Sequence, residues 1–198
     1  MRIKLTILIL LLSLSAWSQK SNTEKYGVDK CYTSIEDALA EKDKVECLDL
    51  TRQKLKSFPT EILEFKNLKV LILSKNKIEE LPAEIGQLDS LHTLVAYRNG
   101  ITDIRFLAGA PQLKHVDLSD NFIEEIPDEI EQCSSLEYLN LNMNILAKTS
   151  ASLGYLPNLK VLDVTENEMT RDEQDFLKNI LPNTDIKFSP PCFCKFDD

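Results

Sequence analysis

The sequence predicts an α/β solenoid with a curved parallel β-sheet on its concave side and short helical turns on its convex side. Three observations lead to this prediction. An apolar pattern closed by an amide residue recurs six times, at intervals of 22 or 23 residues, and such a period is typical of stacked repeats. Each copy joins a strand-like alternation to a helical return. Helix-forming segments stand before the first copy and after the last.

The repeated segments are VECLDLTRQKL (45–55), LKVLILSKNKI (68–78), LHTLVAYRNGI (91–101), LKHVDLSDNFI (113–123), LEYLNLNMNIL (136–146) and LKVLDVTENEM (159–169). Positions 1, 4, 6 and 11 are apolar, and position 9 is the amide. The segments resemble the leucine-rich repeat, LxxLxLxxNxL, of the 23-residue class that secreted bacterial proteins also use. The resemblance covers residues 45–188 and implies a curved scaffold that binds other proteins through its concave sheet.

The alternation within each segment predicts a short strand with one face inward, so that Leu71 and Leu73 point into the core. The amide lies where the strand ends, and its side chain can pair with backbone groups that the bend leaves free. We therefore expect a structural ladder of Asn76, Asn99, Asn121, Asn144 and Asn167. Gln53 is one methylene longer, which leaves the tightness of the first turn open.

The return path carries an apolar-Pro motif in FPTEILEF (58–65), LPAEIGQL (81–88) and IPDEIEQC (126–133). Proline is tolerated at the first position of a helical turn, so these segments predict short turns whose isoleucines face the core. The isoleucines are Ile62, Ile85 and Ile130. The third repeat, DIRFLAGAPQL (103–113), lacks the proline step and is one residue shorter, so its local curvature should differ.

The chain divides into five parts: a signal peptide (1–18), an N-terminal cap (19–44), six repeats (45–169), a C-terminal helix-strand cap (170–188) and a tail (189–198). Arg2 and Lys4, an apolar run and a small-x-small site before Gln19 are typical of a cleaved export signal. The apolar run is about half the roughly 20 residues of a membrane span. We expect cleavage near Ser18/Gln19 and a secreted, periplasmic or cell-surface location.

Both caps are predicted from capping-box spacings. Thr33-x-x-Glu36 precedes Ile35, Ala38 and Leu39, and Thr170-x-x-Glu173 precedes a longer helix. The apolar stripe expected on that longer helix is Phe176, Leu177, Ile180 and Leu181. Residues 185–188 alternate as a last strand, which Pro190 and Pro191 end.

The five cysteines differ in their expected states. Cys133 occupies a repeat position held elsewhere by core residues, which predicts a buried, unreactive thiol. A disulfide between Cys31 and Cys47 would attach the cap to the first strand and is one of two open alternatives, the other being free thiols. Free, intermolecular and metal-bound states all stay open for Cys192 and Cys194.

The charge limits the classes of partner. The formal charge is −9, and loss of Arg2 and Lys4 with the signal peptide would make it −11. An acidic surface repels phosphate backbones and anionic lipids, so neither nucleic acid nor a membrane surface is an expected partner. We expect a monomer that is not inserted in a membrane after signal cleavage.

Positions 3, 5, 7 and 8 of the repeats should form columns on the concave face. Apolar and aromatic residues gather there, and position 8 changes from basic to acidic along the array, which is typical of a contact surface. The expected partner-binding residues are Val70, Ile72, Val95, Tyr97, Arg98, His115, Tyr138 and Met143. A face of roughly 400 Å² suits a peptide, loop or small domain.

Enzyme chemistry finds little support in the sequence. It contains no Gly-rich phosphate loop, nucleophile elbow or histidine-carboxylate metal motif, and we expect neither a catalytic residue nor a cofactor. The main hypothesis is an exported, non-enzymatic recognition module for a peptide or protein. One alternative is an anchoring protein tethered through Cys192 and Cys194, and a remote one is metal-dependent activity at His115 and Asp117.

Overall fold

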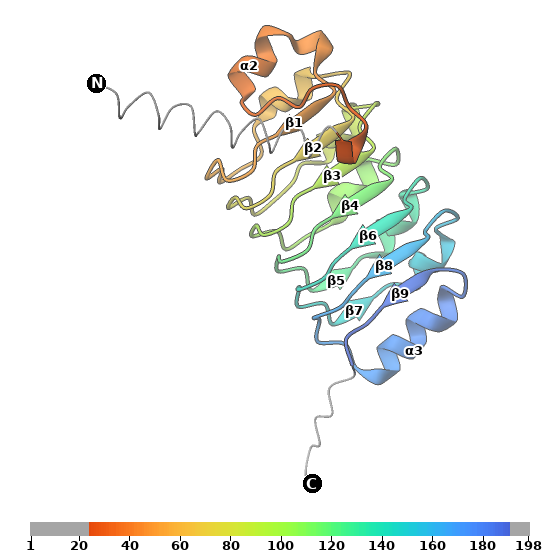
Figure 1. The fold of residues 1–198 in the computed structure, drawn as a ribbon. Helices are drawn as coiled ribbons and strands as arrows, with labels where there is room; N and C mark the ends of the chain where they lie inside the picture. Colours follow the sequence, from red (N-terminus) through yellow and green to blue (C-terminus); the bar gives the residue numbers. More distant parts are fainter. Residues whose placement is uncertain (1–23, 191–198) are drawn as a thin grey trace.

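A computed structural model describes residues 24–190 and contains a solenoid built on a seven-stranded parallel sheet (Figure 1). The strands follow the order β1-β2-β3-β4-β6-β8-β9. Their bounds are Cys47–Asp49, Val70–Ile72, Thr93–Val95, His115–Asp117, Tyr138–Asn140, Val161–Asp163 and Asp185–Lys187. Each of the six repeats supplies one strand, and the C-terminal cap supplies β9, as the sequence predicted.

The strands pair without any slip in register. Position 3 of each repeat pairs with position 3 of the next, as in Val70 with Thr93 and Thr93 with His115. The short third repeat does not break this register, because its missing residue lies on the convex path. Nine residues, 96–104, lead from β3 to the next helical turn, whereas ten, 73–82, follow β2. The concave columns therefore continue from end to end.

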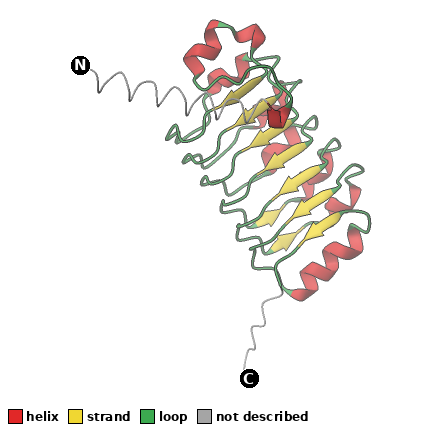
Figure 2. Ribbon diagram, viewed as in Figure 1, coloured by secondary structure: helices red, strands yellow, loops and turns green. Residues whose placement is uncertain are grey.

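Short 3-10 helices form the return path, and they lie along one side of the strand ladder (Figure 2). They are η2 (Thr60–Glu64), η3 (Ala83–Gln87), η4 (Arg105–Gly109), η5 (Asp128–Gln132) and η6 (Ala151–Tyr155). A proline precedes η2, η3 and η5, and Ile62, Ile85 and Ile130 are buried as predicted. A second, two-stranded sheet pairs β5 (Glu125–Ile126) with β7 (Lys148–Thr149), which the sequence did not predict.

Leucines from all repeats share one continuous core. Leu71, Leu73, Leu139 and Leu141 are all fully buried within a single cluster that runs from the N-terminal cap to Leu181. Cys133 belongs to this cluster, and burial raises the pKa of its thiol to about 12. The thiol is therefore protonated and unreactive at neutral pH, in agreement with the prediction.

The asparagines form the expected ladder. Asn121 illustrates it: its Nδ2 donates to the carbonyl oxygens of Ala96 (3.1 Å) and Leu118 (2.8 Å), while its Oδ1 accepts from the amide of Ile101 (3.1 Å). The same three bonds recur at Asn76, Asn99, Asn144 and Asn167. Gln53 departs from the ladder, since its Nε2 donates to the carbonyl of Thr33 in the cap (2.8 Å).

Position 8 is a turn residue rather than part of the flat sheet. All six residues there have a positive φ between 53° and 63°. They are Arg52, Lys75, Arg98, Asp120, Met143 and Glu166. This left-handed residue bends the chain so that the following asparagine can reach the backbone of two repeats. Each strand ends at position 5, so position 8 lies in the turn that follows the strand, at the rim of the sheet.

The two caps agree with the predictions except in two details. Helix α2 (Ile35–Ala40) has Ser34 as its N-cap, with Oγ accepting from the amide of Asp37, so the predicted cap at Thr33 is wrong by one residue. Helix α3 (Arg171–Ile180) has the predicted capping box of Thr170 and Glu173.

The apolar stripe of α3 also differs in one member. Leu177 and Leu181 are buried and Ile180 packs against the core, but Phe176 is 37% exposed. Gln174 takes the buried place instead, and its Nε2 donates to the carbonyl of Ser189 (3.5 Å). The helix therefore covers the end of the core with a narrower apolar face than the sequence predicted.

Candidate functional site

Residues 24–32, which we call the N-terminal strap, lie over the first part of the concave face. In Figure 1 this red segment runs from the cap toward β3. Val28 and Cys31 of the strap form a buried cluster with Cys47, Val70 and Ile72 of β1 and β2. Val70 and Ile72 are only 0% and 5% exposed. The expectation that these two residues face a partner is wrong, because the chain's own strap covers them.

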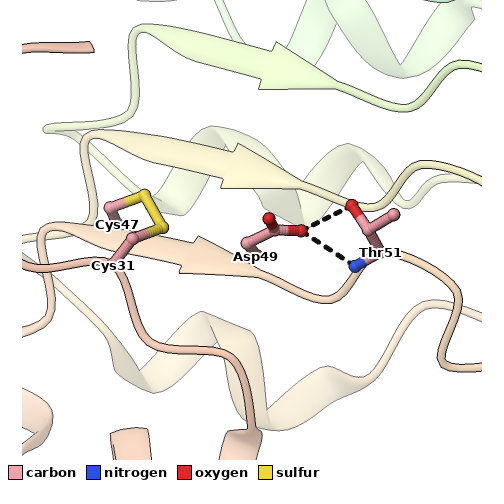
Figure 3. The surroundings of a disulfide bond; sticks show 4 residues. All are labelled: Cys31, Cys47, Asp49 and Thr51. Atoms are coloured by element: carbon pink, nitrogen blue, oxygen red, sulfur yellow. Dashed lines mark hydrogen bonds between the residues drawn. A yellow bond between two sulfur atoms is a disulfide. The ribbon is translucent and has the colours of Figure 1, made fainter. Parts of the chain in front are cut away.

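A disulfide fastens the strap. Cys31 is bonded to Cys47 of β1 (Figure 3), which is one of the two alternatives that the sequence left open. Both cysteines are buried, and the amide of Tyr32 donates to the carbonyl of Cys47 (2.9 Å) just beyond the bond. Cys47 occupies position 3, whose side chain points to the concave side. A disulfide at this position must therefore bring the preceding residues onto the concave face.

A cavity of about 450 Å³ opens where the strap ends. The strap forms one wall, and the strands β3, β4 and β6 form the rest. The lining residues are Lys25, Tyr26, His92, Thr93, Leu94, Val95, His115, Val116, Asp117 and Tyr138. This volume lies in the range of pockets that hold a small molecule or one or two side chains of a peptide.

Aromatic rings and one carboxylate dominate the wall opposite the strap. The rings of His115 and Tyr138 lie 6.5 Å apart between centroids and are inclined by 30°. The Oδ1 atom of Asp117 accepts from the amide and hydroxyl of Ser119 (3.0 and 2.6 Å) and from Nδ2 of Asn140 (3.2 Å). Within residues 24–190 no hydrogen bond reaches its Oδ2. One acceptor of this carboxylate is thus free for a ligand.

The ionisable groups of the cavity influence one another. A hydrogen bond with Tyr26 raises the pKa of Lys25, and the negative charge of Asp117 adds to this effect. Burial raises the pKa of Tyr138, and Asp117 again contributes. Burial lowers the pKa of His92, with further repulsion from His115, and its Nδ1 lies 2.9 Å from the hydroxyl of Thr93. The cavity therefore favours a cation near Asp117 and disfavours one at His92.

The predicted binding residues fall into three groups. Val95, His115 and Tyr138 line the cavity, and Val70 and Ile72 lie under the strap. The third group lies at the edge where the strands end. It contains Tyr97, Arg98 and the half-exposed Met143. The Nζ atom of Lys75 lies 5.2 Å from the ring centroid of Tyr97, and Arg98 pairs with Asp120 at 3.7 Å.

Two further features were missed by the sequence analysis. Lys25 and Tyr26 line the cavity, but they precede the repeats and carry no periodic signal. Position 5 residues also have a structural role: Asp49, Asp117 and Asp163 each accept from the amide and hydroxyl of the residue two positions later, as Figure 3 shows for Asp49 and Thr51. The recurrence of Asp with Ser or Thr at this spacing was the available signal.

No group of three histidine, cysteine, aspartate or glutamate side chains is placed to hold a metal ion within the described part of the chain. His92, His115 and Asp117 line the same cavity, but among the described residues they are not placed to hold a metal ion together. Between residues 24 and 190, no helix is both long and apolar enough to cross a lipid bilayer. The export signal and Cys192 and Cys194 lie outside the described residues.

Comparisons with known proteins agree with this architecture. A family model described as Leucine Rich repeats (2 copies) matches residues 66–109 and 111–152. A search of curated protein sequences gave no match. Among solved structures, a leucine-rich-repeat protein of Leptospira interrogans is 28% identical, with a TM-score of 0.63 over 83% of this chain and 49% of that chain. Internalin C2 of Listeria monocytogenes is 22% identical, with a TM-score of 0.59 over 74% and 62%.

A plant peptide hormone receptor, RGFR1 in complex with RGF2, is also similar: it is 29% identical, with a TM-score of 0.51 over 58% of this chain and 19% of that chain. This chain thus spans about half of the Leptospira protein and a smaller part of the receptor. The repeated segments, the asparagine ladder, the parallel concave sheet and the matching family model lead to one conclusion. The fold of this chain is the leucine-rich-repeat solenoid, and residues 66–109 and 111–152 match the model of leucine-rich repeats.

Proposed function

We propose that this protein is a non-enzymatic recognition module that binds an extended peptide or an exposed loop of another protein. The binding surface is the part of the concave face that the strap leaves open, from the cavity at β3 to β9. The leucine-rich-repeat fold is typical of proteins that bind other proteins, and one similar structure is a receptor in complex with the peptide hormone RGF2. The observation that carries the proposal is the 450 Å³ cavity with aromatic walls.

The size of the open surface favours a peptide over a folded domain. The strap covers β1 and β2, which leaves the cavity and the strands β4, β6, β8 and β9. Four strands spaced about 4.8 Å apart, with a width of about 16 Å, provide roughly 300 Å². A standard protein interface takes roughly 800 Å² from each partner. An extended segment with one anchoring side chain in the cavity fits this surface better.

We further propose that the protein acts outside the cytoplasm. Stable disulfides form in oxidising compartments, and the Cys31–Cys47 bond agrees with the export signal expected in residues 1–18. Mass spectrometry of the protein purified from a secreting host should give an N-terminus at Gln19. A mature chain that still begins at Met1 would contradict this part of the proposal.

Affinity capture with a matched pair of tyrosine variants tests the binding site. Tyr138→Ala removes an aromatic wall of the cavity, whereas Tyr155→Ala removes a 73% exposed ring from η6 on the convex side. We expect wild type and Tyr155→Ala to retain the same proteins and Tyr138→Ala to lose them, as measured by quantitative mass spectrometry. Equal retention by all three proteins, with unchanged circular dichroism, would reject the concave site.

A further inference from the structure

We infer that the partner segment is basic and that one of its lysine or arginine side chains enters the cavity to pair with Asp117. This inference rests on the proposed function and specifies the chemistry of the partner. It follows from the way the strap divides the concave face and from the position that the chain's own Lys25 takes at the border. Three observations support it, and each concerns a different set of residues.

The strap divides the face by charge. The first two repeats, where the strap covers the apolar Val70 and Ile72, carry the basic residues Arg52 and Lys75 at position 8. The open half carries acidic residues on its strands and rim: Asp117, Asp120, Asp163, Glu166 and Asp185. The open strands and their rim therefore carry more acidic than basic side chains, with Arg98, Lys187 and Lys25 as the basic ones near them.

The basic side chains near the open half are already engaged. Lys187 on β9 pairs with Asp163 at 3.5 Å, and Arg98 pairs with Asp120 at 3.7 Å. Asp117 differs, because within the described residues it has no ion pair and its Oδ2 accepts no hydrogen bond. Its Oδ1 is held by Ser119 and Asn140, so the orientation of the carboxylate is fixed before a ligand arrives.

The cavity provides the other contacts that a cationic side chain needs. The rings of Tyr26, His115 and Tyr138 line it together with Asp117. A lysine or arginine over an aromatic face gains a cation–π interaction, and an arginine can also form charge-assisted hydrogen bonds with a carboxylate. A cavity of about 450 Å³ has room for such a side chain together with part of its backbone.

Lys25 of the strap already places a cation in this cavity. It lines the same cavity, and although its hydrogen bond with Tyr26 is the main cause of its raised pKa, the charge of Asp117 also contributes. Lys25 therefore lies in the electrostatic field of Asp117, where a cation of the partner would also lie. It competes with that cation, so its removal should improve binding while removal of Asp117 weakens it.

Selection from a phage-displayed library of random peptides of about 12 residues tests the inference. A segment of that length spans the open strands, because an extended chain covers about 3.3 Å per residue. The supporting result is enrichment of peptides rich in lysine and arginine. Enriched peptides without basic residues would overturn the inference and leave peptide recognition standing. No enrichment at all would overturn peptide recognition, and the inference with it.

Calorimetry with one enriched basic peptide then tests Asp117 directly. Asp117→Asn keeps an oxygen for Ser119 but loses the charge, and we expect Kd to rise about tenfold. Lys25→Ala should lower Kd by about two- to fivefold, and added NaCl should reduce both effects. Glu84→Gln on the convex η3 is the charge-matched control and should leave Kd unchanged.

If Asp117 had only a structural role, Lys25→Ala would not bind the peptide more tightly. A rise of Kd in Asp117→Asn together with a fall of Kd in Lys25→Ala would therefore indicate that Asp117 binds the cation of the peptide. If Asp117→Asn does not fold, Glu166→Gln on the exposed rim is the second variant, with a smaller expected rise in Kd. Unchanged Kd in all variants would overturn the inference.

Discussion

Single side chains at fixed repeat positions hold the turns of this solenoid together. Each ladder asparagine pairs with four backbone groups that the left-handed residue before it would otherwise leave unpaired. The cost of an unpaired buried polar group is about 1–3 kcal/mol. Asparagine suits this position because its short amide side chain reaches backbone groups of its own repeat and of the preceding repeat. Gln53, at the end of the array, bonds with the cap instead.

Loss of a ladder asparagine should therefore be costly. Asn121 is 5% exposed, and Asn121→Ala removes the hydrogen-bond partner of Ala96, Leu118, Ser119 and Ile101. We expect the free energy of unfolding to fall by about 2–4 kcal/mol, measured by urea denaturation. Asn158→Ala is the control, because Asn158 is exposed and makes a single hydrogen bond with Ser134 (2.8 Å). A loss no greater than in this control would contradict the structural role.

Glu41 links the cap to the acid stability of the protein. Its Oε2 accepts from the hydroxyl of Tyr32 (2.5 Å) and from Nζ of Lys30 (3.0 Å), and these bonds lower its pKa to about 2. The ionised form is therefore favoured by folding. The contribution of the ionised Glu41 to the free energy of unfolding is complete above the usual glutamate pKa of about 4.3, and it is lost as the pH falls toward 2.

We expect Glu41→Gln to lower Tm at pH 7 and the difference from wild type to shrink between pH 5 and pH 2. Thermal unfolding by circular dichroism at several pH values measures it. Glu61→Gln on the convex η2 is the control and should follow wild type at every pH. A difference that stays constant down to pH 2 would mean that the carboxylate does not provide this stability.

At the scale of elements, two 3-10 helices of the convex side approach closely at glycines. A Cβ atom on Gly86 of η3 would lie 1.6 Å from the carbonyl oxygen of Gly109 in η4, and one on Gly109 would lie 2.8 Å from the carbonyl oxygen of Ala83. These contacts involve backbone atoms, which cannot rotate away. The short third repeat brings its helical turn η4 against η3 of the preceding repeat, and the two glycines make that contact feasible.

Gly86→Ala should thus force the two turns apart and destabilise the protein by about 1–3 kcal/mol. Alanine would otherwise stabilise a helical position, so the sign of the change identifies the clash. Gly100→Ala is a matched control, since the nearest atom to its Cβ would be the flexible Cγ of Glu79 at 3.3 Å and the nearest backbone atom, the oxygen of Ile78, lies at an ordinary contact distance of 3.5 Å. Denaturant unfolding of both variants measures the effect, and equal stabilities would contradict the close approach.

At the scale of the whole molecule, the sequence predicted the repeated parts and missed the one that does not repeat. Six copies of one pattern fix the strands, the core leucines and the ladder, because every copy supports the same alignment. The strap has no second copy and only a few apolar residues. The cavity and the burial of Val70 depend on where residues 24–32 lie, so residue patterns within the repeats could not predict them.

One inference was nevertheless available from the sequence. Cys47 lies at a concave position, and a bond from it to Cys31 requires the strap to cross that face. The disulfide and the concave position of Cys47 imply this crossing together, although neither implies it alone. Tertiary contacts of this kind follow from the sequence only when a covalent constraint is combined with the direction of a side chain.

The solenoid architecture predicts that release of the strap has only local effects. Repeats contact only their neighbours, so a change at one end should not spread along the array. In a Cys31→Ser/Cys47→Ser double variant the closed loop, a sequence separation of 16 residues, is lost, and stability should fall by about 3 kcal/mol. Val70 and Ile72 should then become exposed at least transiently.

Hydrogen exchange followed by mass spectrometry measures this prediction at both ends of the molecule. We expect faster exchange in residues 24–32 and in β1, where the amides of Tyr32 and Asp49 pair strap with strand (2.9 and 2.8 Å), and unchanged exchange in β8 and β9. Wild type in which dithiothreitol has reduced the Cys31–Cys47 bond should give the same pattern. Uniformly faster exchange would contradict local unfolding, and unchanged exchange in the strap would show that its packing holds it without the disulfide.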